Sequence, residues 1–162
     1  MCTVEQMGTD IFPRFEIRRD GTWEPVELLP EFDSNTATDE EFMAYGNHPA
    51  SINRNYALFA VLAGVRNTFG LTPISSPRGL PKDVSLQVRS DLIGSYGPGP
   101  SWVTLDELLR YNWDQIIRDS RHSHAKPESC REAVEPFLSL NLPYLLAQVE
   151  NPADFRIVFD FG

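Results

Sequence analysis

Alternating apolar and polar residues near the start of the chain predict a β-hairpin. Within residues 12–18, Phe15 and Ile17 fall on one face and charged residues on the other, as in a strand with one buried face. Asp20-Gly21 then marks a tight turn, and residues 23–26 form the returning strand.

A second alternating segment closes the chain and predicts another strand with one buried face. Apolar and other side chains alternate there, with Phe155, Ile157, Phe159 and Phe161 against Arg156, Val158 and Asp160. Its expected partner is the N-terminal hairpin, since each has one apolar face that needs cover. Pro13 and Pro25 indicate that parts of the hairpin lie at a sheet edge, because proline cannot donate a ladder hydrogen bond.

Residues 56–65 predict a buried central helix, because every position except Gly64 is apolar and no polar face remains. Asn53 or Asn55 would cap its start, and Arg66 follows where a cation favours the helix C-terminus.

Shorter helices are predicted from caps and apolar spacing. The first begins at Asp83 and has an apolar stripe of Val84, Val88 and Leu92. A capping box at 104–107 begins the second, and residues 113–117 form the third. Asn141 caps the fourth, which covers residues 142–149. Residues 29–41 are acidic and polar, which predicts a loop.

These elements predict an α+β fold: a small, mainly antiparallel sheet of N-terminal hairpin plus C-terminal strand, packed on the buried central helix and further short helices. The 162 residues suit one domain, which we place at 7–162, with 1–6 as extra N-terminal residues.

Composition narrows the location and the partners. The longest apolar run is too short to span a bilayer, and no secretory signal follows Met1, so we expect a cytoplasmic protein. Cys2 and Cys130 match neither a disulfide framework nor a paired metal knuckle. The net charge of -9 argues against duplex nucleic acid or a membrane as main partner, because both are anionic. A small anionic ligand in a local basic pocket stays compatible with it.

No constellation for metal binding or catalysis stands out, so we expect no metal, no cofactor and no catalytic residue. His122 and His124 form the only close histidine pair, in a polar loop, where solvated side chains are the simpler interpretation. Cys130 falls in a predicted helix and fits a buried or idle thiol. No phosphate-binding loop or dinucleotide fingerprint occurs.

Arginine, amide and aromatic side chains next to glycine and proline turns suggest a ligand site. A nucleotide-like ligand is bound by a guanidinium for phosphate, an amide for base or ribose, and a ring for stacking. The candidate residues are Arg66, Asn67, Arg78, Gly79, Tyr96, Ser101 and Trp102. Alternatively, these groups tie loops to backbone carbonyls.

Five segments carry a family resemblance that covers nearly the whole chain from Met7 onward. They read MGTDI at 7–11, NYALFAVLAGVRN at 55–67, PRGLPKDVS at 77–85, SWVTLDELL at 101–109 and RIVFDF at 156–161. In this order they resemble a family of small proteins of bacteriophages, prophages and their hosts. Members of that family carry histidines where this chain has Phe12 and residues 97–100. Because this chain lacks those histidines, a binding function is favoured over an enzymatic one.

The resemblance implies a phage-encoded anti-defence protein that acts in the host cytoplasm. On this hypothesis it sequesters a nucleotide-derived immune second messenger without turnover. Ligands of such proteins tend to lie between subunits, so we expect a homo-oligomer. Two alternatives stay open: a phosphodiesterase that cleaves the same messengers, and an acidic adaptor or inhibitor that binds a host protein through the 29–41 loop.

Overall fold

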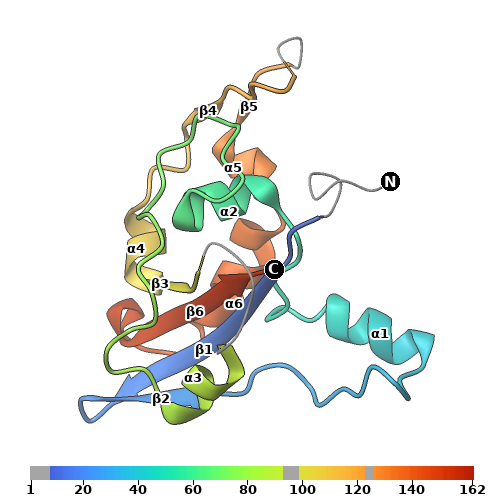
Figure 1. The fold of residues 1–162 in the computed structure, drawn as a ribbon, viewed down its shortest axis with the longest axis vertical. Helices are drawn as coiled ribbons and strands as arrows, with labels where there is room; N and C mark the ends of the chain where they lie inside the picture. The colour runs from blue at the N-terminus through green and yellow to red at the C-terminus, as the bar shows by residue number, and fades with distance from the viewer. Residues whose placement is uncertain (1–7, 93–98, 123–125) are drawn as a thin grey trace.

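The centre of the molecule is a four-stranded antiparallel sheet. The computed structural model describes residues 8–92, 99–122 and 126–162, so the N-terminal residues 1–6 lie outside the described part. Across the sheet the strands are β2 (Thr22–Val26), β1 (Ile11–Arg19), β6 (Phe155–Phe161) and β3 (Ser101–Thr104), in that order (Figure 1). The predicted α+β fold is confirmed, with the hairpin and the C-terminal strand in one antiparallel sheet and β3 as a further strand.

The β1–β2 hairpin turns where the sequence predicts. Asp20 and Gly21 have φ values of 51° and 77°, as both central residues of a type I′ turn require. Pro25 lies in β2, an edge strand, as expected. Pro13 lies in β1, beyond the part of this strand that pairs with β2. The last such pair is Phe15 with Val26, so no β2 residue faces this proline.

Strand β6 is buried on both faces, and the prediction of a single buried face is wrong. All seven of its residues are buried. The second face is covered by α3 (Leu86–Leu92) and the residues before it, since Val84, Val88 and Leu92 form one cluster with Val158. This helix begins at Leu86 rather than Asp83, and the Ser85 hydroxyl accepts a hydrogen bond from the Val88 amide at 3.3 Å.

Helix α2 (Tyr56–Ala63) packs on the other face and is the buried central helix that the sequence predicts. Seven of its eight residues are buried. The side chain of Asn55 caps its start, and Gly64 ends it in the left-handed conformation at φ 70°. The ring of Phe59 lies 4.9 Å from that of Phe161, which joins helix and sheet.

The segment 113–117 is not helical, contrary to the prediction. Helix α4 (Leu105–Arg110) has the predicted capping box and ends before Tyr111, which is extended. Trp113 is buried, and its indole N–H donates to the Leu108 carbonyl at 2.8 Å, which turns the chain. The chain continues into β4 (Ile116–Ile117), which pairs with β5 (Glu128–Ser129).

Contrary to the prediction, the Asn141 side chain does not cap the helix that follows it, and this helix ends at Leu146 rather than Val149. The side-chain amide of Asn141 donates to the carbonyls of Pro49 at 2.7 Å and Ser51 at 2.9 Å, so it ties two distant segments together. The chain here forms α5 (Cys130–Ala133), a π-helical turn (Phe137–Asn141), α6 (Leu142–Leu146) and a 3-10 turn (Pro152–Asp154).

Part of the predicted 29–41 loop is helical. Helix α1 (Asp39–Gly46) starts inside that segment because the Thr38 hydroxyl accepts a hydrogen bond from the Glu41 amide at 3.2 Å. None of its eight residues is buried. Figure 1 shows α1 standing apart from the sheet and from the other helices.

A buried ion pair joins the two central strands. Glu16 of β1 and Arg156 of β6 are register partners, and both side chains are almost fully buried, at 0% and 3% exposure. Arg156 Nε donates to Glu16 Oε1 at 2.8 Å, and its Nη1 donates to Asp83 at 2.9 Å. The other Glu16 oxygen accepts from the Ser85 amide, and the Arg156 guanidinium lies 4.0 Å from the centre of the Trp23 ring.

Replacing Arg156 with methionine is expected to lower the free energy of unfolding by about 3–5 kcal/mol, because Glu16 would stay buried without its cation. The double variant Arg156→Met, Glu16→Leu should recover most of that loss, since neither charge is then buried. Urea unfolding followed by tryptophan fluorescence measures both. The control is Arg19→Met, whose exposed ion pair with Glu24 is expected to contribute less than about 1 kcal/mol. Equal losses in the single and double variants would contradict the assignment.

Candidate functional site

The structure separates the predicted ligand residues into two groups. Arg78, Gly79, Ser101 and Trp102 lie together where the 77–81 segment meets β3. Arg66 and Asn67 follow α2 and contact other residues. Tyr96 lies outside the described residues.

Arg78 is held within the protein by several groups. Its guanidinium donates to both carboxylate oxygens of Glu107, at 2.8 and 2.5 Å, and to the Trp102 carbonyl at 3.0 Å. The guanidinium also lies 4.6 Å from the centre of the Trp102 ring. The Arg78 amide donates to the Ser101 hydroxyl, and the Gly79 amide donates to the Pro100 carbonyl. These contacts fasten the segment to β3 and α4, which is the alternative that the sequence left open; their role in ligand binding stays a prediction.

The Arg78–Glu107 pair shifts both ionisation equilibria. Burial alone would raise the pKa of Glu107, but hydrogen bonds from Arg78 and Thr104 bring the pKa of this carboxyl below its ordinary value. The pKa of Arg78 is raised, mainly by its hydrogen bonds to Glu107.

In the second group, Asn67 closes a turn and Arg66 lies against the Tyr56 ring. The side-chain amide of Asn67 donates to the Leu71 carbonyl at 2.7 Å and accepts from the Leu71 amide at 3.3 Å. Arg66 has a positive φ of 55°, and its Nε donates to the Thr9 hydroxyl at 3.0 Å. Its guanidinium lies 5.3 Å from the centre of the Tyr56 ring.

A pocket of about 650 Å³, here the ribbon pocket, opens between the start of α2 and the β4–β5 ribbon. Its lining includes Tyr56, Phe69, Arg118, His122, Lys126 and Glu128. The Arg121 guanidinium lies 5.4 Å from the centre of the Phe69 ring, and the Arg66 guanidinium lies 5.3 Å from the centre of the Tyr56 ring. Each aromatic ring of this pocket therefore has an arginine across it.

Acidic groups of the ribbon pocket are partly neutralised. Asp119 accepts hydrogen bonds from the Arg121 side chain, the Arg121 amide and the Thr68 hydroxyl. The Arg121 side chain is the main cause that lowers the pKa of Asp119 to about 2. For Arg118 and Lys126, by contrast, no hydrogen bond or ion pair of the side chain occurs within the described residues.

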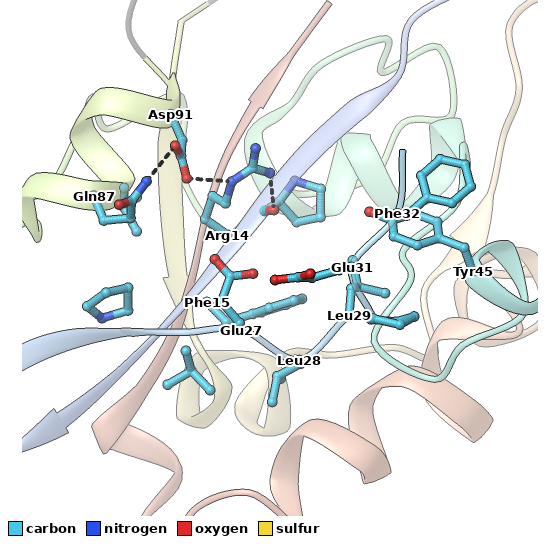
Figure 2. Close-up of a pocket in the computed structure, with 15 residues that line it drawn as sticks. Arg14, Phe15, Glu27, Leu28, Leu29, Glu31, Phe32, Tyr45, Gln87 and Asp91 are labelled. Atoms are coloured by element: carbon cyan, nitrogen blue, oxygen red, sulfur yellow. Dashed lines mark hydrogen bonds and ion pairs between the residues drawn. The ribbon is translucent and has the colours of Figure 1, made fainter. Parts of the chain in front are cut away.

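A second pocket of about 510 Å³, here the acidic pocket, lies between β1, the chain after β2, and α3. Figure 2 shows the carboxylates of Glu27 and Glu31 facing each other across it. Its one lining arginine, Arg14, donates to Asp91 at 3.1 Å. Phe32 and Tyr45 stack with ring centres 4.7 Å apart at one end.

Candidate nucleophiles and metal ligands gain no support from the geometry. Cys130 is buried, and burial raises its pKa to about 11, so this thiol is protonated at neutral pH. Over residues 8–92, 99–122 and 126–162, no three His, Cys, Asp or Glu side chains are grouped to hold a metal ion. His124 falls outside these ranges. None of the described helices has the length and apolar character to cross a bilayer.

Comparison of the chain with protein-family models, with curated proteins and with solved structures finds no match. The resemblance to phage proteins therefore stays a prediction.

Sequence reasoning missed both pockets as sites. The ribbon pocket joins Tyr56 and Phe69 to a polar loop far along the chain, and its one local signal is the cluster of basic residues between 118 and 126. The acidic pocket had a signal in the 29–41 segment, but Arg14 and Asp91 are separated by 77 residues.

Replacing Glu107 with glutamine is expected to destabilise the protein by about 1–2 kcal/mol at neutral pH, because a charge-assisted, mostly buried pair is lost. A depressed pKa in the folded state means that the contribution is complete above the ordinary glutamate pKa of 4.5 and disappears as the pH falls through the folded value. The difference from the wild type should therefore shrink below pH 4.5.

Urea unfolding over a pH series measures this effect. Asp106→Asn is the matched control, because Asp106 also lies in the first turn of α4 but pairs with the exposed Arg110. Its effect is expected to stay within about 0.5 kcal/mol. A destabilisation by Glu107→Gln that is independent of pH would exclude the ion pair as its source.

Proposed function

We propose that the protein is a binding protein that sequesters a small, anionic, nucleotide-like molecule without turnover, and that the ribbon pocket holds it. The observation that carries the proposal is the pair of aromatic rings in one pocket, Tyr56 and Phe69, each with an arginine across it.

The chemistry of this pocket suits such a ligand. A nucleobase can stack on an aromatic or guanidinium plane, and phosphate oxygens accept hydrogen bonds from arginine and lysine. Arg118 and Lys126 supply cations that the described residues do not engage. A volume of about 650 Å³ is in the range of small-molecule sites.

Local charge also distinguishes this pocket on a chain with a net charge of -9. Its lining has two cations, Arg118 and Lys126, and three acidic side chains, Asp119, Glu128 and Glu132. Two further arginines, Arg66 and Arg121, lie against its Tyr56 and Phe69 rings, and Arg121 pairs with Asp119. The acidic pocket has one arginine and three carboxylates in its lining, so an anion is disfavoured there.

The biological role rests on the resemblance stated above. On that basis the ligand is a nucleotide second messenger of a bacterial defence system, and the protein is a phage-encoded anti-defence factor in the host cytoplasm. A homo-oligomer that places the pocket near a partner subunit would deepen it. Turnover by a phosphodiesterase is the alternative, and the fate of the ligand separates the two.

The test mixes the protein with a panel of linear and cyclic nucleotides, then measures free ligand before and after heat denaturation. Sequestration predicts that one member of the panel disappears on mixing and returns intact on heating. Cleavage predicts that it returns only as products. If no member is depleted, the proposed function is wrong.

For a ligand found in this way, Arg118→Ala and Arg66→Ala are each expected to weaken binding about ten- to a hundredfold, the loss of one charge-assisted contact. Arg19→Ala is the control, because it removes another exposed arginine, from the β1–β2 hairpin. Calorimetric titration measures the affinities. Loss of binding in a folded Arg78→Ala variant, with Arg66→Ala and Arg118→Ala unaffected, would move the site to the 77–81 segment.

A further inference from the structure

Helix α1 buries little of its surface against the described part of the chain. All eight of its residues are at least partly exposed, and the side chains of Phe42 and Met43 are 47% and 66% exposed. A helix this short is marginal in water unless it buries a face. Among residues 8–92, 99–122 and 126–162, its ring contacts are limited to Phe32, which meets Phe42 edge-on at 4.8 Å and stacks on Tyr45. A large apolar surface therefore stays open on α1.

This open face continues into the acidic pocket. Phe32 and Tyr45 belong to the pocket wall as well as to the ring cluster beside α1. In Figure 2 these two rings lie at one end of the pocket, and the Leu29 side chain lies near Glu31. The pocket and the helix thus form one surface, the α1 face.

Charge on the α1 face is acidic and not compensated from within the protein. Its carboxylates are Glu27 and Glu31 in the pocket and Asp39, Glu40 and Glu41 in the first turn of α1. In the described ranges none of the five pairs with a lysine, arginine or histidine. Arg14 is committed to Asp91.

We propose that the α1 face is a docking surface for a basic, amphipathic segment of a partner protein, a segment that carries lysine or arginine beside a large apolar side chain. The apolar side chain covers Phe42 and Met43. A lysine or arginine enters between Glu27 and Glu31 and lays its aliphatic stem along Leu29.

Charge complementarity selects this occupant over others. Two copies that paired through this face about a two-fold axis would bring the same carboxylates together, which is unfavourable. Nucleic acid and anionic lipid are repelled for the same reason. This surface is separate from the ribbon pocket, so the inference is independent of the proposed function.

The probe is a fluorescein-labelled helical peptide with leucine and lysine at amphipathic spacing, and its partner peptide has glutamate in place of lysine. Fluorescence anisotropy is expected to show binding of the lysine peptide and none of the glutamate peptide. Glu27→Gln with Glu31→Gln should weaken binding about three- to tenfold, because two partly exposed ion pairs are lost.

Two matched controls separate a specific surface from general attraction to an acidic protein. Glu135→Gln with Glu150→Gln removes the same charge from exposed sites elsewhere and should change affinity less than about twofold. Phe42→Ser with Met43→Ser should weaken binding, whereas Leu109→Ser with Leu140→Ser, at 49% and 40% exposed positions, should not.

Hydrogen exchange locates the peptide without relying on any variant. The bound peptide is expected to slow exchange of the amides of α1 and of residues 27–32. Protection elsewhere would overturn the proposal, and so would equal weakening by both glutamine pairs or no binding of the lysine peptide. Dimerisation through this face, seen as protection of α1 that grows with protein concentration alone, would likewise overturn it.

Discussion

The ion pair between Glu16 and Arg156 is the constraint on which the rest of the sheet depends. Neither charge could be buried without the other, and the Arg156 guanidinium is also held by Asp83 and the Trp23 ring. The pair is complete only when β1, β6 and the chain before α3 are all in place. It therefore favours one strand order and fixes the entry to α3, whose Gln87 and Asp91 then form a wall of the acidic pocket.

The long-range part of this arrangement is what sequence patterns could not show. Period-two alternation correctly located β1, β2 and β6, but it marked Arg156 and Asp160 as solvent-facing because their chemistry is polar. The burial of Arg156 depends on Glu16, which lies 140 residues away, and the same face of β6 is covered by α3, which packs against Val158. Asn141 was misjudged for the same reason, since its acceptors are carbonyls some 90 residues earlier in the chain.

At the candidate sites, the sequence predicted contacts between neighbouring residues better than contacts between distant segments. The sequence identified the capping role of Glu107, and the structure adds that the same carboxylate binds Arg78 from 29 residues away. Arg78 was predicted to contact a ligand, but it pairs with Glu107. Sequence spacing does not indicate this pair, because the two residues belong to different elements. Arg66 was chosen for its place after the central helix, and that place does bring it to the Tyr56 ring.

The two edges of the sheet are closed in different ways. On one side, Pro25 interrupts the row of amides in the short strand β2. On the other, the carbonyls of Pro100 and Trp102 at β3 accept hydrogen bonds from the Gly79 amide and the Arg78 side chain. A neighbouring molecule thus finds few free backbone groups with which to extend the sheet. For the four-stranded sheet, contact with another molecule through side chains is therefore favoured over the addition of a further strand.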